Sequence, residues 1–284
     1  MRIIFAGRDN SFNRKIIHDF SKEHEIVCCL FLEPERVSWK GKRKMIMRRV
    51  KKYGLIKTLD QLAFHWFDRR FLRKNEAVFW KTRAEYCDPS IQLNYPVYQV
   101  NNINNKEWVE LCRELKPDII LATCSQVIFK PQLYTIPSLG TYIIHEGLTP
   151  EYKGLHTPLW ALMKKDFQHI GYTVLKANEK IDGGEILIQG TYSIQPGESY
   201  RAWSWIGHNA IIAGLDDIRR CFRELEKKKY FIPISVEGRK SGYYTWIGLS
   251  NFIGLYLKNY RKESSVKQSY AVDQVRSELM EPAT

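Results

Sequence analysis

Residues 140–190 hold the side chains of this chain that are best suited to moving protons. His145 ends an apolar run, Gly140–His145, and a Gly- and Pro-rich loop follows it. Asp182 lies on a later turn, Asp182-Gly-Gly184. An imidazole can act as a general acid or stabilise an oxyanion, and a nearby carboxylate can orient it. The pair therefore predicts a proton-transfer site, with a structural histidine at a strand end as the alternative.

The elements around these two residues predict an α/β fold. Arg2–Ala6 and Glu25–Leu32 are apolar runs typical of buried strands, and a helix with Ser11 as its N-cap is expected between them. The alternation returns after residue 105, with strands expected at 119–122, 140–145, 172–175 and 186–189, and a long helix over 211–225. Ligands bind at the carboxyl ends of the strands in an open parallel sheet, where His145 is expected.

A polar turn, Gly7-Arg-Asp-Asn10, directly follows the first predicted strand. Such a turn can bind a phosphate or a sugar at the N-terminus of the following helix. It can equally be an ordinary strand-to-helix turn that needs no ligand. The full GxGxxG pattern of dinucleotide-binding folds is not present here, so a dinucleotide site is a weak interpretation.

The order of the short motifs resembles that of the 10-formyltetrahydrofolate-dependent formyltransferases. This family includes methionyl-tRNA, glycinamide ribonucleotide and sugar-nucleotide amine formyltransferases. His145 matches the family histidine, Pro150 its proline and Tyr152-Lys-Gly154 its Tyr-Arg-Gly, while Gly171-Tyr-Thr173 matches G-x-T and Asp182 opens D-x-G. The motifs are short, but their order and spacing together are specific. The resemblance covers roughly residues 1–30 and 98–225, and it implies a Rossmann-like, mostly parallel sheet.

The resemblance also implies roles for particular residues. His145 and Asp182 are expected to be catalytic, and no metal is expected. The formyl donor 10-formyltetrahydrofolate is expected to contact Gln126, Val127, Ile128, Ala177, Asn178, Glu179 and Ile181. The substrate-binding residues are expected to be Gly7, Asn10, Tyr152, Lys153 and His156, although His156 can also be a loop residue that only makes local hydrogen bonds.

Two positions depart from the family pattern. The family asparagine two residues before the histidine is Ile143 here, and the family serine two residues after it is Gly147. Loss of one oxyanion donor typically costs about 2.7–4 kcal/mol of transition-state stabilisation. Another donor can substitute, a hydrolase can act on the same scaffold, or the chain can be a catalytically weakened module that still binds folate or a nucleotide. The sequence leaves these alternatives open.

The positive charge is concentrated in one segment. The chain of 284 residues has 44 Lys and Arg against 31 Asp and Glu, a net charge of +13. The whole excess lies between Arg36 and Arg83, and we interpret residues 36–85 as a basic helical insertion. This segment can be a solvated face, a lid over an anionic substrate, or a docking site for tRNA or for a membrane surface.

Residues 226–284 do not resemble the C-terminal barrel of methionyl-tRNA formyltransferases. The favoured substrate is therefore a small anionic amine, either phosphorylated or linked to a nucleotide, such as a nucleotide-linked amino sugar, and not a nucleic acid.

The remaining organisation follows from composition. Residues 1–228 are expected to form the catalytic domain, 229–262 an aromatic-rich C-terminal appendage, and 263–284 a disordered tail. No run of 18 apolar residues is present, which excludes a transmembrane helix from the expected elements. The six cysteines lack metal-ligand spacing, and with the absence of a signal-like N-terminus they predict a cytoplasmic protein with reduced thiols.

Overall fold

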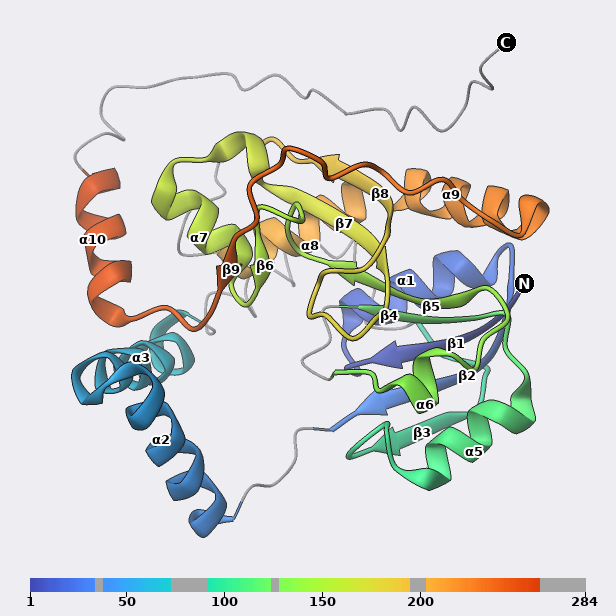
Figure 1. Cartoon of the computed structure of the whole chain (residues 1–284), viewed down its shortest axis with the longest axis horizontal. Helices are drawn as coiled ribbons and strands as arrows, with labels where there is room; N and C mark the ends of the chain where they lie inside the picture. The colour runs from blue at the N-terminus through green and yellow to red at the C-terminus, as the bar shows by residue number, and fades with distance from the viewer. Residues whose placement is uncertain (34–37, 73–90, 124–127, 195–202, 261–284) are drawn as a thin grey trace.

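The computed structural model describes residues 1–33, 38–72, 91–123, 128–194 and 203–260. Within them one seven-stranded sheet has the order β3-β2-β1-β4-β5-β7-β8 (Figure 1). The strands are β1 (Arg2–Gly7), β2 (Glu25–Leu32), β3 (Val97–Val100), β4 (Ile119–Thr123), β5 (Gly140–His145), β7 (Gly171–Lys176) and β8 (Ile186–Thr191). The first five pair in parallel, whereas β7 pairs antiparallel with β5, and β8 antiparallel with β7. The predicted α/β, mostly parallel sheet is confirmed.

Helices cover both faces of this sheet. Because side chains alternate along a strand, Ile3 and Phe5 of β1 pack on one face while Ile4 and Ala6 pack on the other. The first face is covered by α1 (Ser11–Ser21), α8 (Trp203–Ala213) and α9 (Leu215–Lys228), and the second by α5 (Lys106–Leu115) and α6 (Pro131–Tyr134) (Figure 1). Burial on both faces explains why the central strands are continuous apolar runs.

The cap of α1 differs from the expected one. Asn10, and not Ser11, is the N-cap, because the Asn10 side chain accepts a hydrogen bond from the backbone N–H of Asn13 at 2.8 Å. Asn and Ser are almost equally good caps, so the residue types alone did not decide between neighbouring positions.

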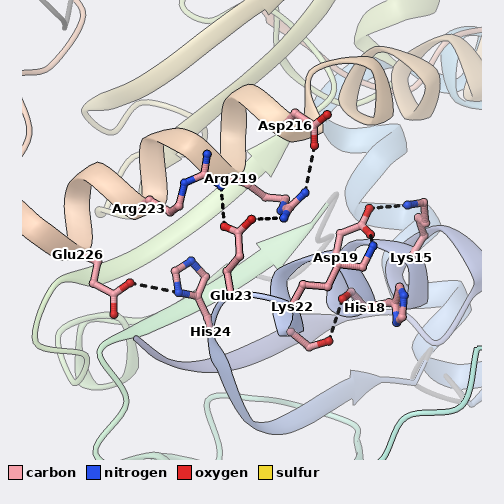
Figure 2. A network of polar contacts seen from close by, with 11 residues as sticks. Lys15, His18, Asp19, Lys22, Glu23, His24, Asp216, Arg219, Arg223 and Glu226 are labelled. Atoms are coloured by element: carbon pink, nitrogen blue, oxygen red, sulfur yellow. Dashed lines mark hydrogen bonds and ion pairs between the residues drawn. The ribbon is translucent and has the colours of Figure 1, made fainter.

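Polar contacts join the turn between α1 and β2 to α9 (Figure 2). Glu23 pairs with Arg219 and with Arg223, the latter at 2.7 Å. His24, whose side chain is buried, lies 3.2 Å from Glu226 through Nδ1. These contacts fasten the first βα unit to the last long helix of the sheet domain.

The segment 36–85 is described over residues 38–72. It forms α2 (Trp39–Tyr53), α3 (Leu55–Phe67) and a π-helical turn, η1 (Asp68–Leu72), which agrees with a helical insertion. After α9 the chain returns through β9 (Tyr243–Tyr244), which pairs in parallel with β6 (Lys153–Gly154), and then forms α10 (Leu249–Tyr260). α2, α3 and α10 lie together beside the sheet domain (Figure 1).

A third apolar cluster joins these elements to the loop after β5. It contains Phe64 of α3, Phe252 of α10, Tyr152 and Leu159. Leu159 belongs to α7 (Thr157–Lys164), which is followed by a 3-10 turn, η2 (Phe167–His169). The insertion and the C-terminal segment therefore pack on the part of the chain that directly follows His145, the last residue of β5.

No helix of the described residues is long and apolar enough to cross a bilayer. Four of the cysteines lie in these residues, and all four are free thiols. Cys28, Cys29 and Cys112 are buried, while Cys221 is partly buried. The predicted tail, residues 263–284, lies outside the described residues.

Candidate active site

His145 is the last residue of β5, and its side chain is buried. Its Nε2 lies 2.9 Å from the backbone carbonyl oxygen of Tyr152. A carbonyl oxygen can only accept a hydrogen bond, so Nε2 carries a proton and donates it. Nδ1 is then the ring atom that can gain or lose a proton without breaking this bond.

Asp182 faces that atom. Its Oδ2 lies 3.8 Å from Nδ1 of His145, close enough for a charge interaction and too long for a direct hydrogen bond. The same Oδ2 accepts a hydrogen bond from the backbone N–H of Gly154 at 2.8 Å. Asp182 also has a φ of 46°, in the left-handed region that non-glycine residues rarely occupy. Such strain persists where the surroundings hold the residue in place, as they commonly do at functional sites.

The two residues share a cavity of about 350 Å³. Four of the expected folate-binding residues line it, namely Ile128, Ala177, Asn178 and Ile181. Glu179 is not among its lining residues, and Gln126 and Val127 lie outside the described residues. The cavity therefore brings four of the five described residues that were expected to bind the donor to the His145–Asp182 pair.

Most of the expected substrate-binding residues do not line this cavity. His156 does, but Gly7 ends β1 and Asn10 serves as the cap of α1. Tyr152 is buried, and its hydroxyl donates a hydrogen bond to Asp166 at 2.7 Å. Lys153 pairs through its backbone with Tyr243.

Ile143 lines the cavity at the position where the resembled family has asparagine. It is partly buried and packs against the apolar cluster beneath β4 and β5. No side-chain amide is therefore offered from that position. The lining residues whose side chains can donate hydrogen bonds are His145, His156, Thr157, Asn178, Lys180 and Tyr243.

The second departure, Gly147, has a steric reason. A Cβ placed on Gly147 would come within 2.8 Å of Thr157 Oγ1 and 3.0 Å of the Tyr152 carbonyl oxygen. The Thr157 hydroxyl in turn donates to the backbone carbonyl of Glu146. Thr157 therefore occupies the space that a serine side chain at position 147 would need.

A polar network holds the loop between β5 and β6. Thr173 Oγ1 donates to the Gly147 carbonyl at 2.6 Å, and Gln189 Nε2 donates to the Thr149 carbonyl at 2.6 Å. Arg239 makes two hydrogen bonds to Glu151, at 2.9 and 2.6 Å. Burial alone would raise the pKa of Glu151, but the hydrogen bond from Arg239, a backbone hydrogen bond and the nearby positive charge together outweigh it, and the pKa is lowered.

The C-terminal segment extends this support. Lys153 N–H donates to the Gly242 carbonyl at 3.0 Å, and Gly242 N–H donates to the Pro150 carbonyl at 2.9 Å. Trp160 Nε1 donates to the Thr245 carbonyl at 2.9 Å. We name residues 239–246 the strap. Sequence reasoning missed it, because no motif relates this segment to a loop almost a hundred residues earlier.

A second cavity, of about 530 Å³, adjoins the first, since Leu155 and Tyr243 line both. One wall is α2, which supplies Lys44, Arg48, Arg49 and Lys52. The Arg49 guanidinium lies 4.5 Å from the ring centre of Trp246, and burial lowers the pKa of Arg49. We name this space the basic cavity. The spacing of Lys44, Arg48 and Lys52 is the sequence signal that could have found it, because i, i+4 and i+8 share one helix face.

In sequence, this chain matches one protein family and a number of individual proteins. The family described as formyl transferase matches residues 1–205. The methionyl-tRNA formyltransferase of Kosmotoga olearia is 32% identical over 105 residues, which are 37% of this chain and 33% of that protein. The bifunctional polymyxin resistance protein ArnA of Wigglesworthia glossinidia brevipalpis is 36% identical over 106 residues, 37% of this chain and 16% of that protein. These matches span a third or less of the relatives' own length.

Solved structures with a similar fold include glycinamide ribonucleotide transformylase 1 from Symbiobacterium toebii. It has a TM-score of 0.51 at 14% identity and covers 85% of this chain and 92% of its own. HypX from Aquifex aeolicus in complex with tetrahydrofolic acid has a TM-score of 0.52 at 14% identity, with 88% of this chain and 30% of its own covered. At this identity the likeness concerns the fold alone.

Proposed function

This chain belongs to the formyl transferase family, and from that premise we propose that it moves a formyl group from 10-formyltetrahydrofolate to the amine of a small, phosphorylated or nucleotide-linked acceptor. The observation that carries the proposal is the pairing of His145 with Asp182 inside a cavity that also contains Ile128, Ala177 and Ile181. A transferase activity follows from the family, whereas the donor and the acceptor are proposed.

We name the cavity that His145 and Asp182 share the catalytic cavity. The residues that line it support 10-formyltetrahydrofolate as the donor. Ile128, Ala177 and Ile181 offer an apolar wall for a flat ring, and Asn178 offers polar atoms close to it. HypX, which shares this fold, was solved with tetrahydrofolic acid bound. When bound, 10-formyltetrahydrofolate supplies a formyl carbonyl on a nitrogen that can leave.

The chain's own residues would manage charge and protons. The neutral acceptor amine forms a bond to the formyl carbon, the carbon–N10 bond breaks, and one proton passes from the amine to N10. His145, protonated at Nδ1, can stabilise the negative charge that develops on the formyl oxygen. Asp182, held by the Gly154 amide, faces that imidazole and can orient it and accept the amine proton.

The basic cavity supports an anionic acceptor. Its four cations come from one helix face, and Trp246 offers an aromatic surface beside them. Phosphate oxygens take charge-assisted hydrogen bonds from Lys and Arg, and a nucleobase or a sugar can stack on an indole ring. Because Leu155 and Tyr243 line both cavities, an acceptor with its phosphates in the basic cavity can extend its amine toward His145.

Ile143 favours a second candidate function. Without the family amide, the formyl oxygen loses one donor and the transfer step is slowed. His145 and Asp182 could then direct water at the formyl group as a hydrolase, or the chain could hold its folate without turnover. Formate release in the absence of an acceptor identifies the hydrolase, and folate binding with neither product identifies the binding module.

The experiment uses amino sugars linked to nucleoside diphosphates as acceptors. The purified chain is incubated with 10-formyltetrahydrofolate and each acceptor, and the product is detected by mass spectrometry as an added formyl group. Arg48→Gln/Lys52→Gln is expected to raise the acceptor KM about ten- to a hundredfold, because each lost cation removes a charge-assisted hydrogen bond. The control is Lys40→Gln/Lys51→Gln, which removes two exposed cations from the same helix outside the basic cavity. Equal KM values for the two variants would contradict the proposed acceptor site.

A further inference from the structure

α3 presents an apolar stripe to solvent. Leu55, Leu59 and Trp66 lie on one face of the helix, at i, i+4 and i+11, and all three are exposed. Ile56 beside them is 84% exposed. The opposite face, which packs on the protein, contributes the buried residues Thr58, Gln61 and Phe64. An ordinary surface helix turns its apolar face inward, whereas α3 carries apolar side chains on its outer face as well as on the inner face, where Phe64 is buried.

α2 adds exposed aromatic and apolar groups to dense positive charge. Trp39 is 81% exposed and Met47 is 62% exposed. The helix contains eight Lys and Arg and no Asp or Glu. Ten of the seventeen large apolar side chains that are exposed in the described residues lie on α2, α3, η1 and α10. Such a concentration on elements that lie together marks an interaction surface.

The stripe is held firmly in this orientation. Asp60 of α3 accepts hydrogen bonds from the backbone N–H and the hydroxyl of Ser250, at 2.8 and 2.6 Å. Gln61 Nε2 donates to the Trp246 carbonyl at 2.9 Å, and Phe64 packs against Phe252 with ring centres 5.3 Å apart. A rotation of α3 that buried the stripe would break these contacts, so among the described residues the stripe stays open to a partner.

The chemistry of the surface selects the partner. A nucleic acid would account for the cations and leave the apolar stripe unused. A second copy meeting through this surface would bring two helices of like charge together, which is unfavourable. An anionic bilayer surface matches both features, because its headgroups attract the cations and its interfacial region accepts Trp, Leu and Ile side chains.

We propose that α2 and α3 form a docking surface for a membrane rich in anionic phospholipid. The apolar stripe of α3 and Trp39 insert into the interfacial region, and Lys40, Lys42 and Lys51 contact the headgroups. Because α2 also lines the basic cavity, docking holds the mouth of that cavity close to the lipid surface. The inference rests on the exposed face and is independent of the reaction proposed for the catalytic cavity.

The test is co-sedimentation of the full chain with vesicles of phosphatidylcholine alone and of phosphatidylcholine mixed equally with phosphatidylglycerol. The wild type is expected to sediment with the mixed vesicles, and with rising salt the binding should weaken. Ile56→Ser/Trp66→Ser removes one apolar side chain of the stripe and the exposed one beside it, and should reduce vesicle binding at least tenfold. Lys40→Gln/Lys51→Gln should reduce it about fivefold for each cation.

Matched controls lie elsewhere on the surface. Ile232→Ser removes an exposed apolar side chain outside this region, and Lys106→Gln/Lys130→Gln removes two exposed cations. Both controls should bind the mixed vesicles as the wild type does. Circular dichroism and the thermal midpoint confirm that each variant is folded. Donor binding measured on Ile56→Ser/Trp66→Ser should equal that of the wild type.

Three results would overturn the proposal. The first is a wild type that does not sediment with the mixed vesicles at low salt. The second is equal binding of the stripe variant and the wild type. The third is a dimer in light scattering that Ile56→Ser/Trp66→Ser abolishes without any change in vesicle binding, which would assign the stripe to a second copy.

Discussion

Asp182 Oδ2, which faces His145 Nδ1 at 3.8 Å, has its position set by a hydrogen bond from the backbone of Gly154. Gly154 has a φ of 98°, and a Cβ there would come within 2.1 Å of the Tyr244 carbonyl oxygen. The close approach of the strap therefore requires glycine at this position. The strap therefore fixes the loop after β5, and that loop fixes Asp182 beside His145.

Asp182→Asn should lower kcat by about 10²–10⁴ if Asp182 assists proton transfer. The amide can still accept the hydrogen bond from Gly154, so the loop is expected to keep its position while the charge beside His145 is lost. The rate of tetrahydrofolate release under single-turnover conditions measures the change. A rate equal to that of the wild type, in a variant with an unchanged thermal midpoint, would remove Asp182 from the proposed mechanism.

Ile143→Asn should raise the transfer rate by about a hundred- to a thousandfold, because it restores one donor toward the formyl oxygen. The substitution gives up apolar packing, so we expect a cost of about 1–2 kcal/mol in unfolding free energy. Ile143→Val controls for the loss of side-chain volume and should leave the rate unchanged. Product formation with the acceptor saturating distinguishes the two variants. An Asn variant no faster than the Val variant would mean that another donor already serves this carbonyl.

Arg239→Met should lower the free energy of unfolding by about 2–3 kcal/mol, since it leaves the largely buried Glu151 carboxylate without its partner. The neighbouring Lys240→Met removes an exposed cation and should change it by less than about 0.5 kcal/mol. Urea denaturation gives both values. Because Arg239 holds the loop that carries Tyr152, the first variant is also expected to lose activity before it unfolds. A cost for Arg239→Met as small as that of Lys240→Met would show that the strap does not depend on this pair.

Acidification below about pH 6.5 should destabilise the protein through His24. Burial, together with the positive N-terminus and Arg223, lowers the pKa of His24 in the folded state, although the carboxylates of Glu226 and Glu23 oppose this shift (Figure 2). The unfolded chain then takes up a proton in a pH range where the native protein does not, so stability falls as the pH drops from the unfolded pKa toward the folded one. His24→Gln should flatten the slope of unfolding free energy against pH between pH 7 and 5, as thermal denaturation at several pH values can measure. An identical slope in the variant would assign the pH dependence to other groups.

The fold followed from the sequence where local signals were strong. Apolar runs such as Arg2–Ala6 and Ile119–Ala122 become buried parallel strands, because both of their faces are covered by helices. The edge strand β3 was not predicted, since its four residues, Val97–Val100, carry a mixed pattern with little burial. Short edge strands acquire their structure from the neighbouring strand more than from their own sequence.

The site could be predicted in part for a similar reason. The strand end placed His145, and the Gly-rich turn placed Asp182, so the pairing of these two residues could be anticipated. The sequence did not predict the part played by Trp246, Tyr243 and Arg239, because these residues reach the site through contacts between distant segments. The assignment of Tyr152 to the substrate set rested on the motif alone, which does not tell which side of the loop a ring occupies.

The central proposal is that the His145–Asp182 cavity binds the formyl donor. Calorimetric titration with 5-formyltetrahydrofolate, a stable analogue, tests it most directly, with the wild type and Asp182→Ala compared under the same conditions. We predict specific micromolar binding to the wild type and weaker binding to the variant, because Asp182 lines the cavity. No detectable binding at millimolar analogue would contradict the proposal and would leave the His145–Asp182 pair without a folate substrate.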